Sequence, residues 1–136
     1  MTINPARCFL AVLAMTAAGV AGAHHSFAMF EFSKQVSIHG TVKEFQWTNP
    51  HVVLWVDVPA SAGEAGGTWS LELTSPGNLT RTGWSRRAFA AGDEVVVDLN
   101  PLRNGKHGGA LVKATLVKTG VVYSTNLRDM ERPGLK

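Results

Sequence analysis

The sequence predicts an all-β protein: a small, five- to six-stranded, OB-like Greek-key barrel with one short helix between its third and fourth strands. The first observation is a series of short segments along the chain that are rich in β-branched and aromatic residues. The second is a helix start, Ser75-Pro76, which offers a capping serine and a proline at the first helical position. Three strands, a short helix and two more strands are the order of an OB-fold, and a simple sandwich of the same strands is the alternative.

Each of the first four expected strands has a pattern of its own. In QVSIHGTVKEF (35–45), apolar or small residues alternate with polar ones, and Gly40 suits the sharp bend that a small barrel needs. The segment HVVLWVDV (51–58) is nearly continuously apolar, as in a central strand, and TWSLELT (68–74) alternates again. GDEVVVDLNPL (92–102) predicts the fourth strand.

The remaining elements follow a glycine-rich loop. RNGKHGG (103–109) is typical of a hairpin loop, and ALVKATLVKTGVVY (110–123) predicts a fifth strand with a short sixth. The expected barrel core takes apolar residues from several strands: Val42, Val53, Trp55, Leu71, Val95 and Val97. Further inward-facing residues are expected in the third strand and the helical region: Trp69, Leu73, Leu79, Trp84 and Phe89.

Residues 1–23 predict a secretory signal peptide. Arg7 is the only charge in this segment, an apolar stretch follows it, and the segment closes with the small residues Ala21-Gly22-Ala23. A membrane anchor is the alternative, but it needs roughly 20 apolar residues, and the histidines at 24 and 25 interrupt the stretch sooner. We therefore expect cleavage after Ala23, a periplasmic or secreted product, and no membrane span in that product.

The exported chain is expected to be one domain, an OB-like barrel over 24–123 followed by a loosely structured tail at 124–136. Cys8, the one cysteine of the sequence, leaves with the signal peptide, which excludes thiolate metal sites and cysteine nucleophiles. The formal charge of +3 falls by one unit with Arg7, and the remaining cations are scattered among acids. In an exported protein this pattern argues against nucleic acid as a partner.

Cleavage after Ala23 would make His24 the first residue, and a first-position histidine can chelate one metal ion through its free amine and its Nδ1. With a third nitrogen this arrangement is a histidine brace, and such nitrogen ligands favour Cu(II). His51 closes the turn Trp47-Thr48-Asn49-Pro50-His51 between two expected strands and is a candidate for the third ligand. The sequence therefore predicts a copper site at His24, His25 and His51.

Other interpretations of these residues stay open. Cleavage after Ala21 would place His24 third in the chain, where an amine, two amides and the imidazole form a square-planar copper or nickel site. The paired histidines are otherwise a polar start ahead of phenylalanines that dock on the barrel. Met29 offers a thioether to Cu(I), but packing is its expected role. His39 on a polar strand face and His107 in a glycine loop are expected to be solvated.

Enzyme signatures are missing from the sequence. It contains no glycine-rich phosphate loop, no H-E-x-x-H and no nucleophile elbow, so we expect a protein without a catalytic site. The alternative to a copper protein is a metal-free OB-type module that binds a protein or an oligomeric ligand in the cell envelope. Trp47, Asn49 and Trp84 are the candidate residues for its stacking patch.

Several stretches together resemble a family of small exported bacterial proteins of unknown function. They are AHHSFAMF, GTVKEFQWTNPHVVLWVDV, the WSLE…SPGNLTR segment with its following Gly-Trp, and GDEVVVDLNPLRNGKHGG. The family's recurrent marks are a His-His-Ser-Phe after the signal peptide and a Trp-x-Asn-Pro-His turn. The resemblance implies that the matching residues carry these marks here: His24, His25, Ser26, Phe27, Trp47, Asn49, Pro50 and His51. It implies a domain type and brings no established activity.

Overall fold

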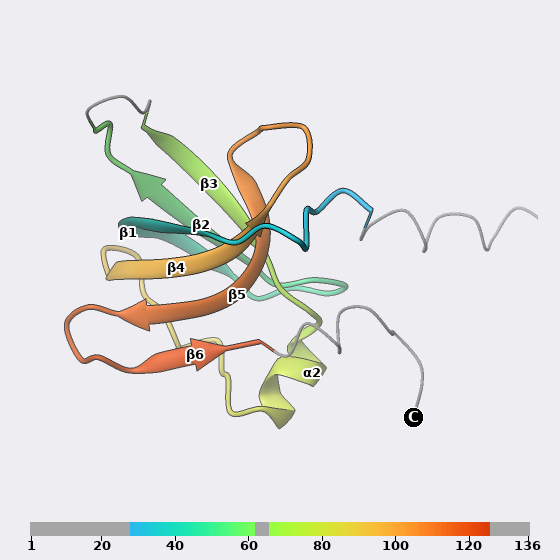
Figure 1. Cartoon of the computed structure of the whole chain (residues 1–136). Coiled ribbons are helices and arrows are strands. Elements are labelled where there is room, and N and C mark those ends of the chain that lie inside the picture. The colour runs from blue at the N-terminus through green and yellow to red at the C-terminus, as the bar shows by residue number, and fades with distance from the viewer. Residues whose placement is uncertain (1–27, 62–65, 126–136) are drawn as a thin grey trace, which may run out of the picture.

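The computed structural model describes residues 28–61 and 66–125, which form a β-barrel with one short helix (Figure 1). The elements are β1 (Val36–Gln46), β2 (Val53–Val58), β3 (Gly67–Glu72), α2 (Pro76–Arg81), β4 (Glu94–Pro101), β5 (Gly108–Leu116) and β6 (Val122–Ser124). The strand order is β3-β2-β1-β4-β5-β6, and an additional pairing between β3 and β5 closes the barrel. This order, with the helix between β3 and β4, confirms the predicted OB-like fold.

Strand β1 is shared by two halves of the barrel. Its first half pairs with β4, its second half pairs with β2, and Thr41 is a partner in both pairings. At the crossing, a Cβ on Gly40 would lie 2.4 Å from the backbone oxygen of Asp57, which is closer than real Cβ atoms approach. The glycine therefore lets β1 bend against β2, as its place in the middle of the strand predicted.

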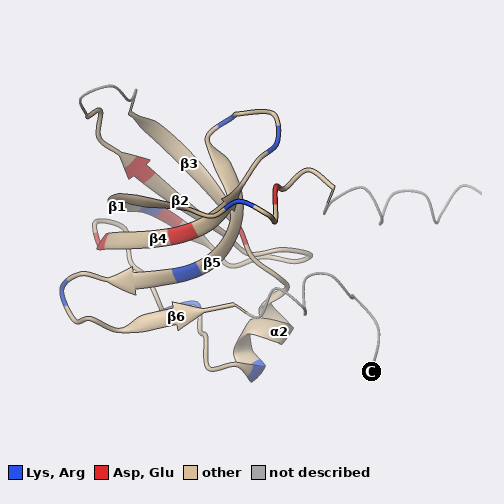
Figure 2. Cartoon of the chain, viewed as in Figure 1, with Lys and Arg blue, Asp and Glu red and all other residues tan. Residues whose placement is uncertain are grey.

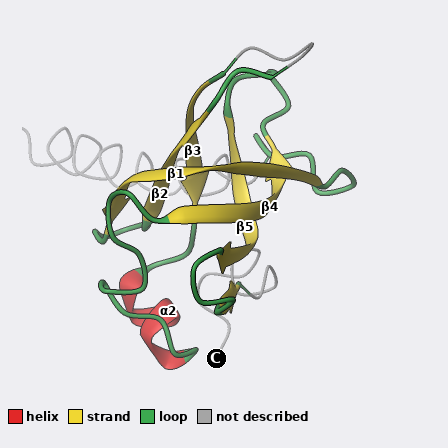
Figure 3. Cartoon of the chain, turned by 90° about the vertical axis from the view of Figure 1, so that its left-hand side faces the viewer, coloured by secondary structure: helices red, strands yellow, loops and turns green. Residues whose placement is uncertain are grey.

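The barrel is closed by the one parallel pairing in the described sheet. Ser70, Leu71 and Glu72 of β3 are partners of residues 108–110 at the start of β5. The later part of β5 pairs with β4 and with the short strand β6. Because β5 serves three neighbours in this way, the sheet curls into the barrel visible in the turned view (Figure 3).

Helix α2 lies at one end of the barrel (Figure 3). Ser75 is its N-cap and accepts a hydrogen bond from the Asn78 backbone N–H at 3.4 Å, and Pro76 occupies the first turn. Leu79 on the helix is buried. Trp84 and Phe89, which follow the helix, pack with it into the main core, as predicted.

The core prediction is right for most strands and wrong for β2. Val42, Leu71, Val95 and Val97 are buried as predicted, but Val53 and Trp55 are only half-buried. The residues of this stretch that fill the core are their neighbours Val52, Leu54 and Val56. Because the run is apolar on both faces, its period does not determine which face is inside, and the register against β1 and β3 does. Trp69 is also only half-buried, whereas Leu73 is fully buried.

Before β1, the described chain runs along the β4–β5 connection. Phe30 and Leu102 form an isolated β-bridge, and Phe30 is almost completely buried. The predicted signal peptide and most of the predicted C-terminal tail lie outside the described residues. Within residues 28–61 and 66–125, no helix has the length and apolar character needed to cross a membrane.

Candidate functional site

His51 and Glu72 meet on the outer face of the β2–β3 pair. Glu72 is the register partner of Val53. His51 lies two residues before Val53, so its side chain is diagonally opposite Glu72 on the same face. His51 Nδ1 lies 2.5 Å from Glu72 Oε1, and the two side chains are 34% and 24% exposed. The pair is therefore partly desolvated and partly exposed.

The contact with the carboxylate engages Nδ1 of the His51 ring. A neutral imidazole whose Nδ1–H donates to a carboxylate has its lone pair on Nε2. Histidines that bind metals in proteins are commonly oriented by such a carboxylate on their other nitrogen. His51 is thus arranged as a histidine of that kind, with Glu72 as the orienting group and Nε2 as the available nitrogen.

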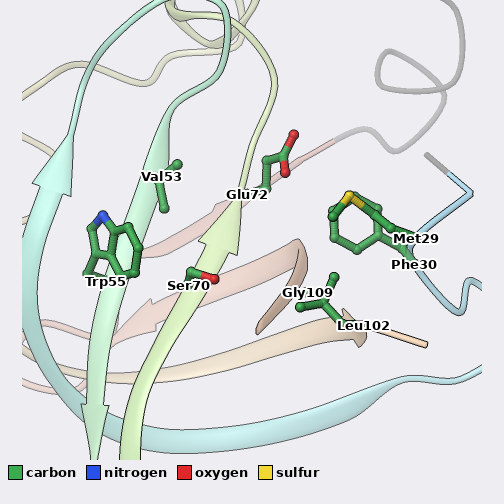
Figure 4. A pocket seen from close by; sticks show the side chains of 8 residues that line it. All are labelled: Met29, Phe30, Val53, Trp55, Ser70, Glu72, Leu102 and Gly109. Carbon is green, nitrogen blue, oxygen red and sulfur yellow. The ribbon is translucent and has the colours of Figure 1, made fainter. Parts of the chain in front are cut away.

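Glu72 also lines a pocket of about 220 Å³ (Figure 4). It is lined by Met29, Phe30, Val53, Trp55, Ser70, Glu72, Leu102 and Gly109. Trp55 is held by a hydrogen bond from its Nε1 to Gln46 Oε1 at 3.2 Å. The pocket thus has mostly apolar walls with a carboxylate among them.

The segment before β1 is fastened beside this pocket by Arg103. The Arg103 backbone N–H donates to the oxygen of Met29 at 2.9 Å, and its Nε donates to the oxygen of Phe30 at 3.0 Å. Its guanidinium also pairs with Glu31 at 2.7 Å. A hydrogen bond from the Ser33 hydroxyl, together with the nearby cations, lowers the pKa of Glu31. These contacts fix the point from which the chain continues back toward its N-terminus.

His24 and His25 lie outside the described residues. His24 precedes Met29 by five residues, and five extended residues span at most about 17 Å. Met29 and Glu72 line the same pocket, so the N-terminal segment begins at the wall of the site that Glu72 shares with His51. Within residues 28–61 and 66–125, no three His, Cys, Asp or Glu side chains are grouped as a metal site requires.

Of the three residues predicted for a stacking patch, Trp84 does not lie at the surface. Trp47 is half-buried and packs edge-on against Phe45, with ring centroids 5.6 Å apart, while Asn49 is exposed. Trp84 is only 3% exposed, and its Nε1 donates to the Ser124 oxygen at 3.2 Å. The assignment of Trp84 to a surface patch is therefore wrong, because the turn after α2 directs this ring into the core.

The other two described histidines are exposed, as predicted, but each has a partner. His39 Nε2 lies 2.7 Å from Glu94 Oε1, and both side chains are more than half exposed. The His107 ring stacks on Trp69 with centroids 4.8 Å apart and an angle of 5° between the planes. Neither histidine lines the pocket beside Glu72.

Sequence reasoning missed the residues around His51. The sequence pattern does not link Glu72 to His51, because a histidine next to β2 and an acid on β3 are seen to share a face only once the register is known. Trp55 and Val53 were assigned to the core and instead line the pocket. Met29 was assigned to packing, yet it is 44% exposed at the pocket wall.

Comparisons with known proteins give a family and no function. No curated protein and no solved structure matches the chain significantly. One family model matches residues 11–112, which include the described segment before β1, β1 to β4 and the first part of β5. That span covers His24, His25, His51 and Glu72, so the candidate site lies within the matched region. The chain belongs to this family, the family of unknown function DUF6152.

Proposed function

We propose that the protein is exported, loses residues 1–23, and binds one copper ion at its new N-terminus. The amine and Nδ1 of His24 supply two ligands, and Nε2 of His51 supplies the third. His25 lies next to this centre and is available as a further ligand. The role is metal binding or delivery in the periplasm or outside the cell, without turnover.

The observation that carries the proposal is the contact between His51 and Glu72. It holds the imidazole with Nδ1 occupied and Nε2 available, which is the arrangement expected of a metal-binding histidine. His39 has the same kind of carboxylate partner, but through Nε2, and it lies with Glu94 in a different surface pocket. Two features therefore favour His51 over His39. Its carboxylate partner, Glu72, lies at Nδ1, and Glu72 lines the same pocket as Met29.

Among the described residues, His51 supplies one ligand and Glu72 orients it. The other two ligands come from the N-terminus. A histidine brace needs no acid among its ligands, so Glu72 acts on the metal through His51. His24 precedes Met29 by five positions, which is enough chain to cross a pocket of this size. The apolar walls formed by Phe30, Val53 and Leu102 would exclude water from one side of the centre.

The test is Cu(II) affinity, measured by competition with a chelator of known affinity, for protein that begins at His24. Adding three glycines before His24 should weaken binding sharply, because the amine can no longer close a six-membered ring with Nδ1 and neither histidine then stands third in the chain, where a square-planar site would form. His51→Ala should also weaken it, whereas the controls His39→Ala and His107→Ala should not. Equal affinity for the glycine-extended and native termini would refute the brace.

A second candidate function, a metal-free module for an oligomeric envelope ligand, is favoured by the pocket itself. Trp55 presents a half-buried ring on the β2–β3 face, the face that OB-folds commonly use for oligosaccharides and oligonucleotides. Chitohexaose is a suitable probe. Binding that is lost in Trp55→Ala and retained in Trp47→Ala, with no effect of copper, would favour this function over the first.

A further inference from the structure

A wider groove lies beside the segment before β1, between that segment, β3 and the β4–β5 loop. Its volume is about 600 Å³, which is within the range of pockets that take small organic ligands. It is lined by Glu31, Lys34, Val36, Trp69, Pro101, Leu102, Arg103, Gly105 and Lys106. Leu102 is the one residue that it shares with the pocket beside Glu72.

The groove is positively charged. Lys34 comes from the segment before β1, and Arg103 and Lys106 come from the β4–β5 loop, so parts of the chain about 70 residues apart bring three cations together (Figure 2). Glu31 is the one acid in the lining and is paired with Arg103. Neither lysine has an ion-pair partner within the described residues. Lys34 and Lys106 are therefore available to bind an anion.

The floor of the groove is an aromatic side chain that is held in place. Trp69 stacks on His107, and a Cβ on Gly67 would lie 2.7 Å from His107 Nδ1, so a glycine there leaves room for the stack. The Trp69 Nε1–H is buried and has no acceptor among the described residues. Such groups are rare in native structures, where buried N–H donors usually find an acceptor.

These features define a ligand with two parts. Phosphates and carboxylates pair strongly with Lys and Arg, which accounts for the cations. The remaining walls, Val36, Pro101, Leu102 and Trp69, are apolar or aromatic and suit a ring. A free inorganic anion would leave these walls and most of the volume unused.

We propose that this groove binds a small ring-bearing anion, that is, an aromatic ring or a sugar that carries a phosphate or carboxylate group. The anion lies between Lys34 and Lys106 with Arg103 at its side, and the ring lies against Trp69 and Leu102. The site uses neither His24 nor His51, so it stands whether or not the protein binds copper.

The experiment is calorimetric titration of the metal-free, full exported chain at about 20 mM salt, where surface charges are weakly screened. Phenyl phosphate carries both parts, while inorganic phosphate carries only the charge and phenol only the ring. Phenyl phosphate should bind at least about tenfold more tightly than either, because each partial probe lacks one set of contacts. Glucose 6-phosphate and benzoate then show whether a sugar or an aromatic ring, and a phosphate or a carboxylate, is preferred.

Matched variants locate the binding. Lys34→Gln with Lys106→Gln should weaken phenyl phosphate at least about tenfold, because two charge-assisted contacts are lost. Lys43→Gln with Lys118→Gln removes the same charge from exposed positions outside the groove and should leave affinity unchanged. Equal weakening by the two double variants would overturn the proposal. So would equal affinity for phenyl phosphate and inorganic phosphate, or no binding of any probe.

Trp69→Phe gives an independent check on the ring. It should weaken phenyl phosphate more than inorganic phosphate, since it changes the aromatic floor and leaves the cations in place. Far-UV circular dichroism and a urea titration establish that the variant is folded. If a folded Trp69→Phe protein weakens both probes to the same degree, the ring does not lie against Trp69 and the proposal fails.

Discussion

Replacing Leu54 with alanine is expected to destabilise the barrel by about 3 to 4 kcal/mol. Leu54 is fully buried between Phe45 of β1 and Leu71 of β3. The change removes three buried carbons, each contributing about 0.8 kcal/mol in transfer free energy, and the cavity that remains adds to the loss. Val53→Ala, one residue away, removes two methyl groups from a half-exposed side chain and should cost less than about 1 kcal/mol.

The assay is urea-induced unfolding followed by far-UV circular dichroism, with free energies compared at equal m-values. Circular dichroism is preferred to tryptophan fluorescence, because the fluorescence of the four tryptophans of the chain would also respond to local changes around β2. The pair of variants tests the facing of β2, on which the position of the pocket depends. A Val53→Ala variant that lost as much stability as Leu54→Ala would show that β2 faces the other way.

Three further predictions concern a glycine, an ion pair and the acid beside His51. Gly40→Ala should cost about 1 to 3 kcal/mol in urea unfolding, since its Cβ would overlap a backbone oxygen, whereas Gly77→Ala, with open space in the helix, should be neutral or stabilising. Lys113, whose Nζ lies 3.0 Å from Asp98, lowers the pKa of that carboxyl. The pair therefore stabilises the fold above about pH 4, and this stabilisation is lost as the pH falls through the lowered pKa. The stability difference between wild type and Asp98→Asn should therefore shrink on acidification, and a constant difference would contradict this. Glu72→Gln should weaken copper about 10- to 100-fold, as loss of an orienting carboxylate does, while Glu94→Gln should leave affinity unchanged.

The order of elements was predictable because it depends on local patterns. The alternation in β1, the capping Ser75 with Pro76, and the glycine in the middle of the first strand each indicate one structure, and together they indicate an OB-like barrel. The facing of β2 was not predictable, because a valine and a tryptophan occupy one face and apolar residues also occupy the other. Only the register against β1 and β3, a long-range property, separates the two faces.

Only the part of the candidate site that depends on a local pattern was predictable. His51 stood out because it closes a distinctive turn, which is a local signal. Its partner Glu72 is separated from it by the β2–β3 hairpin, and the pocket walls come from the segment before β1, β2, β3 and the β4–β5 connection. The groove beside Trp69 was not predictable, because the cations that line it lie far apart in the chain.

The central claim is a copper-binding N-terminus formed by export, and intact mass of the exported protein tests it most directly. The protein should be collected from cells grown with copper and purified without chelators or added metal. Under denaturing conditions the mass should be that of residues 24–136, and under native conditions it should increase by one copper ion. A chain that begins at Met1 or Gly22, or one that begins at His24 and carries no ion, would contradict the account.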